Sequence, residues 1–281
     1  MDNASLFIQT DSTLVSLDKH CYHIAQVLNA LGTTREYDDE GWHTVCDWFR
    51  VASSIKSVDT LLWPMDESGL WCSPAAEYDD EKHKIYNRVT NDLILFNTIY
   101  SGLESLITLL KPLGIKKDGK IKAASKYLET FSANFAPLKY QLELTELLRR
   151  SITCNDNGVN NKYFKPDEFS DILTFGLRAA YSLRNHSAHG SYMFPEPDGW
   201  RLEDCFDTYA WRISSRILLI TNQMLLMVHF RNIGLKDTHA LFEEPDEMFR
   251  EHHSLFSSML PSLKTLHLKP RDRDKNQHWL F

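Results

Sequence analysis

The sequence predicts an all-α protein, and three observations support this fold class. Apolar residues recur at the i, i+3, i+4, i+7 spacing of amphipathic helices through most of the 281 residues. Gly and Pro are sparse, at 11 and 10 residues, which disfavours a fold built from many tight β-turns. Most of the prolines and glycines fall between the helical segments, where helix-breaking residues are expected.

Two helices are expected in the N-terminal region. The first covers residues 11–31, where Asp11 and Ser12 are residue types that cap helix N-termini. The second covers residues 39–62. Residues 63–80 are interpreted as a loop, because they combine Pro64, Gly69 and Pro74 with an acidic run.

From residue 83 the pattern predicts four longer helices with modest connections, which is typical of a helix bundle. They are expected at residues 83–111, at 120–150 with an interruption at Pro137, from just after Pro166 to near Gly190, and at 203–231. The tail is expected to be helical to about residue 266 and then polar, before an apolar end at Trp279–Phe281.

These segments suggest three parts: an acidic N-terminal helical region (1–82), a helix bundle (83–235), and a C-terminal helical extension and tail (236–281). Charge differs between them. Residues 1–80 carry a net charge of −10 and the rest of the chain +3, within a total of −7. The acidic region either shields a basic site or serves solubility.

Composition narrows the class of protein. A hydrophobic share of 43% and a charged share of 25% are ordinary for a soluble globular protein. No apolar run approaches the roughly 20 residues of a membrane-spanning helix, and no secretory signal is visible. The five cysteines are widely spaced and never in C-x-x-C, as in a reduced protein. We therefore expect a cytoplasmic protein with no membrane association.

One short segment contains the candidate catalytic residues. Arg184, Asn185, His186 and His189 lie within six residues at the end of a predicted helix. Arg is always charged and binds phosphate through a planar fork, and His exchanges protons near neutral pH. Cleaving RNA through its own 2′-hydroxyl needs proton transfer and neutralisation of the phosphate, and in principle no metal.

In such a reaction His189 would serve as general acid or base and Arg184 would neutralise the phosphate. Asn185 would bind phosphate or fix an imidazole tautomer. Five residues rotate a helix by about 140°, so Arg184 and His189 do not share a face, whereas Asn185 and His189 do. Either the helix ends before His189, which Gly190 permits, or two copies converge across a two-fold axis.

The segment from Arg184 to His189 resembles the R-x4-6-H motif of HEPN domains, the "higher eukaryotes and prokaryotes nucleotide-binding" superfamily. The resemblance covers residues 83–235 and implies a four-to-five-helix bundle, with the motif near the end of its third helix. It implies a metal-independent endoribonuclease that acts as a homodimer with a composite site, without a cofactor, leaving 2′,3′-cyclic phosphate and 5′-hydroxyl ends. A toxin or phage-defence role, with an antitoxin or regulatory protein as partner, is implied in the same way.

Other interpretations of these residues stay open. Arg184 is alternatively a salt-bridged structural residue and His189 a histidine at a helix C-terminus. His186 either lines the cleft or only packs, and with His189 it forms an H-x-x-H pair that zinc would accept. Glu104 either orients Arg184 across the bundle or is simply exposed. A lysine cluster near residue 120 is either a contact for the RNA backbone or a solvated loop; it comprises Lys116, Lys117, Lys120, Lys122 and Lys126.

No phosphate-binding loop or hydrolase elbow motif is present in the sequence. The first hypothesis is therefore an RNA-cleaving HEPN-type enzyme with Arg184, Asn185 and His189 as catalytic residues, supported by His186 and Glu104. The second is a non-catalytic HEPN-like module that binds a partner protein or a nucleotide. The third is a helical scaffold in which the motif is accidental.

Overall fold

The computed structural model describes residues 3–32, 40–60, 73–112, 115–132, 135–153, 172–192, 194–197, 209–232 and 263–269. These residues are largely helical. Within them there is no strand, only an isolated antiparallel bridge between Leu14 and Leu268. The prediction of an all-α fold is confirmed.

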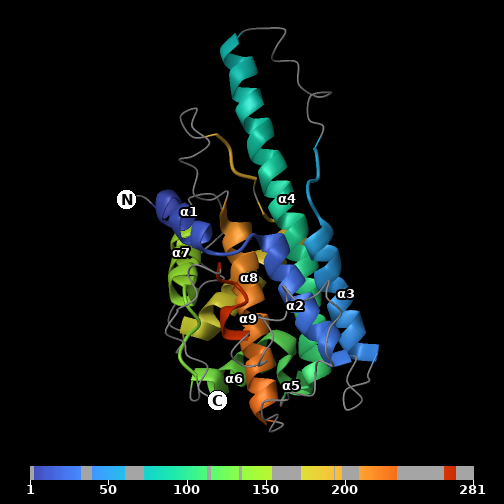
Figure 1. Cartoon of the computed structure of the whole chain (residues 1–281). Helices are drawn as coiled ribbons and strands as arrows, with labels where there is room; N and C mark the ends of the chain where they lie inside the picture. Colours follow the sequence, from blue (N-terminus) through green and yellow to red (C-terminus); the bar gives the residue numbers. More distant parts are fainter. Residues whose placement is uncertain are drawn as a thin grey trace.

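The helices follow one another in the order shown in Figure 1. They are α1 (Asn3–Thr13), α2 (Leu17–Gly32), α3 (Glu40–Ser54), α4 (Ser73–Leu110), α5 (Ile115–Asp118), α6 (Lys120–Ser132), α7 (Gln141–Thr153), α8 (Ile172–Ala188) and α9 (Ala210–Asn232).

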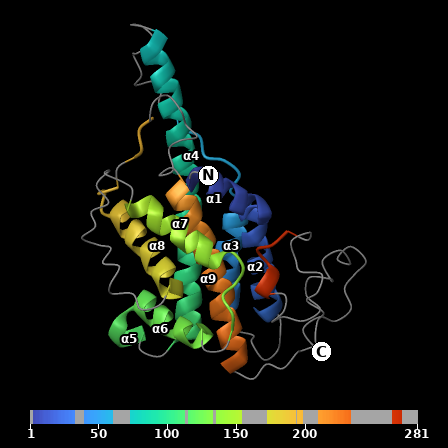
Figure 2. The same ribbon diagram turned by 90° about the vertical axis from the view of Figure 1, so that its left-hand side faces the viewer.

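Helix α9 is the centre of the molecule. From Ala210 to Phe230 all residues are buried except Arg212 and His229, which are half-buried. A helix that is buried all round is a core helix. Figures 1 and 2 show α2 and α3 on one side of it and α6, α7 and α8 on the other. Of the other described helices, five pack directly against α9, namely α2, α4, α6, α7 and α8.

The buried core is continuous along the described chain. It joins Phe7 of α1 and Ile24 of α2 to Phe96 of α4 and Leu266 near the C-terminal end. The predicted boundary between residues 82 and 83 lies within α4. The N-terminal helices thus share one core with the bundle.

The N-terminal segment departs from the prediction of a single helix over residues 11–31. Asp11 belongs to α1. The helical conformation is interrupted at residues 14–16, before α2 begins. The break has a tertiary cause, because Leu14 bridges to Leu268 and the Val15 amide donates to the carbonyl of His267 (3.0 Å). Ser16, not Asp11 or Ser12, accepts the first hydrogen bond of α2, from the His20 amide (2.9 Å).

The prediction of a loop over residues 63–80 is wrong from Ser73 onward, where α4 begins. Pro74 lies in the first turn of α4, where its fixed φ suits a helix and its missing N–H has no helical partner to lose. Residues 61–72 lie outside the described part. Figures 1 and 2 show the N-terminal end of α4 extending beyond the other helices.

The helix predicted at residues 120–150 is two helices, α6 and α7, separated by the segment that contains Pro137. The motif helix α8 therefore follows α4, α5, α6 and α7, and its predicted position as third helix of the bundle is wrong. The helix predicted to reach residue 62 ends at Ser54. The last predicted helix is observed as α9 from Ala210, and its predicted part at residues 203–208 lies outside the described ranges. In the tail only residues 263–269 are described, with a single helical turn.

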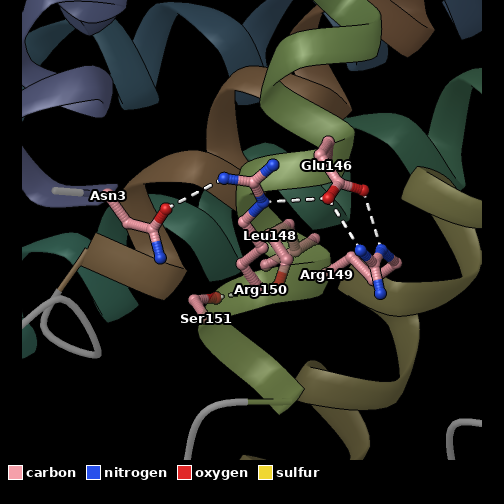
Figure 3. A network of polar contacts seen from close by, with 6 residues as sticks. All are labelled: Asn3, Glu146, Leu148, Arg149, Arg150 and Ser151. Carbon is pink, nitrogen blue, oxygen red and sulfur yellow. Dashed lines mark hydrogen bonds and ion pairs between the residues drawn. The ribbon is translucent and has the colours of Figure 1, made fainter. Parts of the chain in front are cut away.

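Two polar networks tie the ends of the chain to the bundle. Figure 3 shows Arg150 of α7 donating to Asn3 Oδ1 of α1 (3.2 Å) and to Glu146 (2.9 Å), which also binds Arg149. Hydrogen bonds from these arginines lower the pKa of Glu146 to about 2. The second network is buried: Gln223 of α9 lies between His20 Nε2 (2.7 Å) and His267 Nδ1 (3.2 Å).

Two described helices, α4 and α9, are long and apolar enough to cross a membrane by length and composition alone. The expectation that no segment reaches this length is therefore corrected. The apolar window of α9 is 94% buried inside the protein, as in the core helix of a soluble protein, and that of α4 is 44% buried. These helices are weak evidence about a membrane.

Candidate functional site

The Arg184–His189 segment lies at the C-terminal end of α8, which ends at Ala188. The Ser191 amide donates to the His186 carbonyl (2.9 Å) and the Gly190 amide to the Ser187 carbonyl (3.1 Å). This pair of bonds is the Schellman arrangement, which requires a left-handed residue after the helix. Gly190 supplies it, with φ of 67°.

The cap decides where His189 lies. Its amide still donates to the Asn185 carbonyl (3.0 Å), but its side chain is exposed at the end of the helix. Of the two arrangements that the sequence left open, the helix does end before His189. The imidazole is thus accessible to a ligand.

Arg184 is directed to α4. Its guanidinium lies 5.4 Å from the centre of the Tyr100 ring, and its Nη1 donates a long hydrogen bond to Asn185 Oδ1 (3.4 Å). A cation over an aromatic face is attracted by the negative face of the ring. In this chain Arg184 and His189 share no hydrogen bond. Within one chain the Arg184 guanidinium is thus directed to α4, whereas His189 is exposed at the end of α8.

Glu104 is one turn from Tyr100 on α4. The Tyr100 hydroxyl donates to Glu104 Oε1 (3.3 Å), so the carboxylate is connected to Arg184 through the tyrosine. Among the described ion pairs, none joins Glu104 to Arg184 directly. Burial, and then the Glu104 charge, raise the pKa of the Tyr100 hydroxyl, so it stays protonated. Tyr100 is a member of this cluster that the sequence did not single out.

His186 is a buried residue of the cap. Its Nδ1 lies 3.0 Å from the Ser191 hydroxyl oxygen, and that hydroxyl donates to the His186 carbonyl (3.0 Å). Burial, and then the charge of His189, lower the pKa of His186, which favours its neutral form. The contacts of His186 therefore fit a structural role at the helix end.

A cavity of about 610 Å³ lies beside the motif and is lined by residues of α6 and α8. These two helices pack against each other. One face of α8 contributes Arg178, Tyr181, Ser182 and Asn185. These residues are spaced three or four apart, so they form a polar stripe along one helix face. His189, four residues after Asn185, continues that stripe at the helix end.

The opposite wall of the cavity comes from α6 and the residues before it. It includes Lys120 and Lys122, and Glu104 of α4 also lines the cavity. Asp118 forms ion pairs with Lys122 (3.2 Å) and Lys126, whose hydrogen bonds lower the pKa of its carboxyl. Two members of the predicted lysine cluster therefore line the cavity, and Lys116 and Lys117 are exposed nearby.

The polar stripe of α8 is the signal that sequence analysis missed. Arg178, Tyr181 and Ser182 interrupt a helix whose other residues from Thr174 to Leu183 are buried. Polar residues at i, i+3, i+4 and i+7 mark the exposed face of an amphipathic helix. That face, read together with Asn185 and His189, predicts a cavity wall.

No group of three or more His, Cys, Asp or Glu side chains lies close enough to hold a metal ion among the residues that the structure describes. Cys21 and Cys46 are buried free thiols, and the other three cysteines lie outside the described ranges.

No family model, curated protein or solved structure matches this chain.

Proposed function

We propose that this protein is a metal-independent endoribonuclease of the HEPN type, with Arg184, Asn185 and His189 as its catalytic residues. One observation carries the proposal: the exposed His189 ends the polar stripe of α8 that lines a lysine-bearing cavity. A phosphodiester backbone bound at Lys120 and Lys122 would place a phosphate near Asn185 and His189.

The chemistry follows from the residue types. The 2′-hydroxyl of RNA loses a proton, its oxygen attacks the adjacent phosphorus, and the bond to the 5′-oxygen breaks as that oxygen gains a proton. His189 carries one of these protons as general acid or base. Arg184 neutralises charge on the non-bridging oxygens, and Asn185 donates a hydrogen bond to them. The products are 2′,3′-cyclic phosphate and 5′-hydroxyl ends.

A second copy of the chain completes this site in our proposal. Within one chain Arg184 is engaged by Tyr100 and Asn185, while His189 is exposed and shares no hydrogen bond with it. In a two-fold homodimer each motif faces the other, and His189 of one copy can act beside Arg184 of its partner. Through the family resemblance the proposal extends to a toxin or phage-defence effector, restrained by an antitoxin or regulatory protein.

The test is cleavage of end-labelled RNA in the presence of EDTA. The parent protein is compared with Arg184→Ala, with His189→Ala, and with His43→Ala as a matched control, since His43 is an exposed histidine of α3. We expect the parent and the control to leave cyclic phosphate ends. Loss of proton transfer should slow His189→Ala by roughly 10²–10⁴-fold. Equal rates for His189→Ala and the parent would contradict the proposal.

A non-catalytic module is the second candidate, and the placement of Arg184 favours it. The guanidinium is already engaged by Tyr100 and Asn185, as in a structural residue. A purified dimer that binds RNA or a nucleotide but leaves RNA intact in every buffer would support this candidate over the enzyme.

A further inference from the structure

A second cavity, of about 690 Å³, lies at the α1–α2 junction against α9. It shares no lining residue with the cavity beside the motif. Four of its lining residues are cations, namely Lys19, Arg212, Arg216 and Lys269, and Asp11 is its acidic member. The charge of this cavity is thus strongly positive in a protein whose net charge is −7.

Arg216 is the unusual member, because its side chain is only 1% exposed. Its Nε donates to Asp11 Oδ1 (2.8 Å), while its Nη1 is buried without a hydrogen-bond partner. Arg212 repeats the pattern: Nη2 pairs with Asp11 Oδ2 (3.0 Å), and its buried Nε has no partner. A guanidinium carries five N–H donors, and one buried without an acceptor is costly.

Neighbouring acids do not complete this site. Among the residues that the structure describes, Asp11 is the one acid that pairs with both arginines, through one oxygen each. Asp92 of α4 interacts electrostatically with Arg88, Arg212 and Arg216, yet its own Oδ2 is buried without a hydrogen-bond partner. Burial raises the pKa of Asp92 to about 6. Its carboxyl is therefore partly protonated, and less negatively charged on average, in mildly acidic solution. The cluster keeps an excess of buried cationic donors.

We propose that this cavity binds the phosphate group of a small phosphorylated ligand. The two arginines have the planar donors that match phosphate oxygens, and Arg216 is already fixed by Asp11 and by burial. Lys19 is exposed at the start of α2, where the helix dipole also favours an anion. Lys269 is held near the cavity by its Nζ, which donates to the Ser12 carbonyl (2.6 Å).

The site uses α1, α2, α9 and the C-terminal segment, whereas the proposed RNA site uses α4, α6 and α8. Its occupancy is therefore independent of the proposed ribonuclease activity. A bound phosphate would connect Lys269 to Arg216, and so stabilise the packing of the C-terminal segment on the α1–α2 junction.

The experiment is isothermal titration calorimetry of the full chain with inorganic phosphate and with pyrophosphate. Ionic strength is matched in all titrations, and chloride serves as the reference anion. Lys19→Glu tests the cavity without disturbing a buried group, and Lys117→Glu is the matched control at an exposed lysine outside it. We expect the parent and the control to bind. Lys19→Glu should bind at least about tenfold more weakly, since a charge-assisted hydrogen bond to the phosphate is replaced by a repelling carboxylate.

Two outcomes would overturn the proposal: no phosphate or pyrophosphate binding by the parent at millimolar concentration, or equal binding by the parent and Lys19→Glu. Tighter binding of pyrophosphate than of phosphate would assign a diphosphate ligand to the same site. Binding of a short RNA without binding of either small anion would contradict a small-ligand site.

Discussion

The guanidinium of Arg184 lies over the ring of Tyr100, 5.4 Å from its centre, and the Tyr100 hydroxyl donates to Glu104. The arginine of the motif is thus positioned by a residue of α4, some eighty positions earlier in the chain. The importance of this contact for RNA cleavage can be measured by substituting Tyr100.

Two substitutions of Tyr100 distinguish the contribution of its ring from that of its hydroxyl. In Tyr100→Leu the face below Arg184 is lost, and a cation–π contact is worth about 0.5–2 kcal/mol. If Arg184 acts in cleavage, we expect the rate to fall by roughly 2- to 30-fold. Tyr100→Phe keeps the ring and should stay close to the parent rate. The measurement is single-turnover RNA cleavage, with circular dichroism melts to confirm that both variants fold; equal rates for the two variants would contradict a role for the ring.

Gly190 controls the position of His189 through the helix cap. A Cβ at residue 190 would meet no atom within 4 Å, so Gly190→Ala tests only the backbone conformation at φ of 67°. The left-handed region costs a residue with a Cβ roughly 1 kcal/mol or more. We expect Gly190→Ala to be destabilised by about this amount, and Gly190→Asn less, because Asn tolerates this region better.

Urea unfolding measures the stability of both Gly190 variants, and RNA cleavage measures the presentation of His189. Equal stability of Gly190→Ala and the parent would show that the cap does not require a left-handed residue.

The pKa of Asp92 predicts that the free energy of unfolding depends on pH. Its folded-state pKa of about 6 lies above the ordinary aspartate value of 3.8, chiefly because burial disfavours the charged form. The folded state then binds more protons than the unfolded state between these values, so the free energy of unfolding falls as the pH rises from about 4 to about 6. Two pH units correspond to about 3 kcal/mol.

Asp92→Asn removes this titration. We expect it to be more stable than the parent at about pH 8, with the advantage shrinking towards about pH 4. Urea unfolding of both proteins across this range gives the difference directly. A constant difference at all pH values would show that the Asp92 carboxyl does not titrate differently on folding.

The pKa of His20 predicts a pH dependence of the free energy of unfolding with the opposite sign. It is completely buried beside Gln223, and burial, with the charges of His267 and Arg216, lowers its pKa well below 6.5. The unfolded state therefore binds more protons below about pH 6.5, and the free energy of unfolding falls on acidification.

The expected slope for one such histidine is about 1.4 kcal/mol per pH unit below pH 6.5. His20→Gln removes this contribution, so its stability should decline less steeply than that of the parent between about pH 6.5 and pH 5. Parallel urea titrations of His43→Gln serve as the control, since His43 is exposed. Identical slopes for His20→Gln and the parent would contradict the assignment.

Much of the fold was predictable from the sequence, because helical periodicity is a local property. The stripes of apolar residues predicted the helices around Ile24, Phe96 and Leu219, all of which are buried. Helix ends were predicted less well. Pro74 looked like a loop residue, yet it lies in the first turn of α4. The interruption at Leu14 depends on a bridge to Leu268, far along the chain.

The candidate site shows the same division. The sequence by itself determined that Arg184, Asn185 and His189 lie together at a helix end, because Gly190 follows them and a left-handed glycine ends a helix. It also determined that the fold is helical.

Only the tertiary structure decided that Arg184 stacks on Tyr100, that Asn185 shares a cavity with Lys120, and that Asp11 pairs with Arg216 of α9. These contacts join residues between about 65 and 205 positions apart. Their partners are selected by the packing of helices around α9, and spacing along one segment carries no information about that packing.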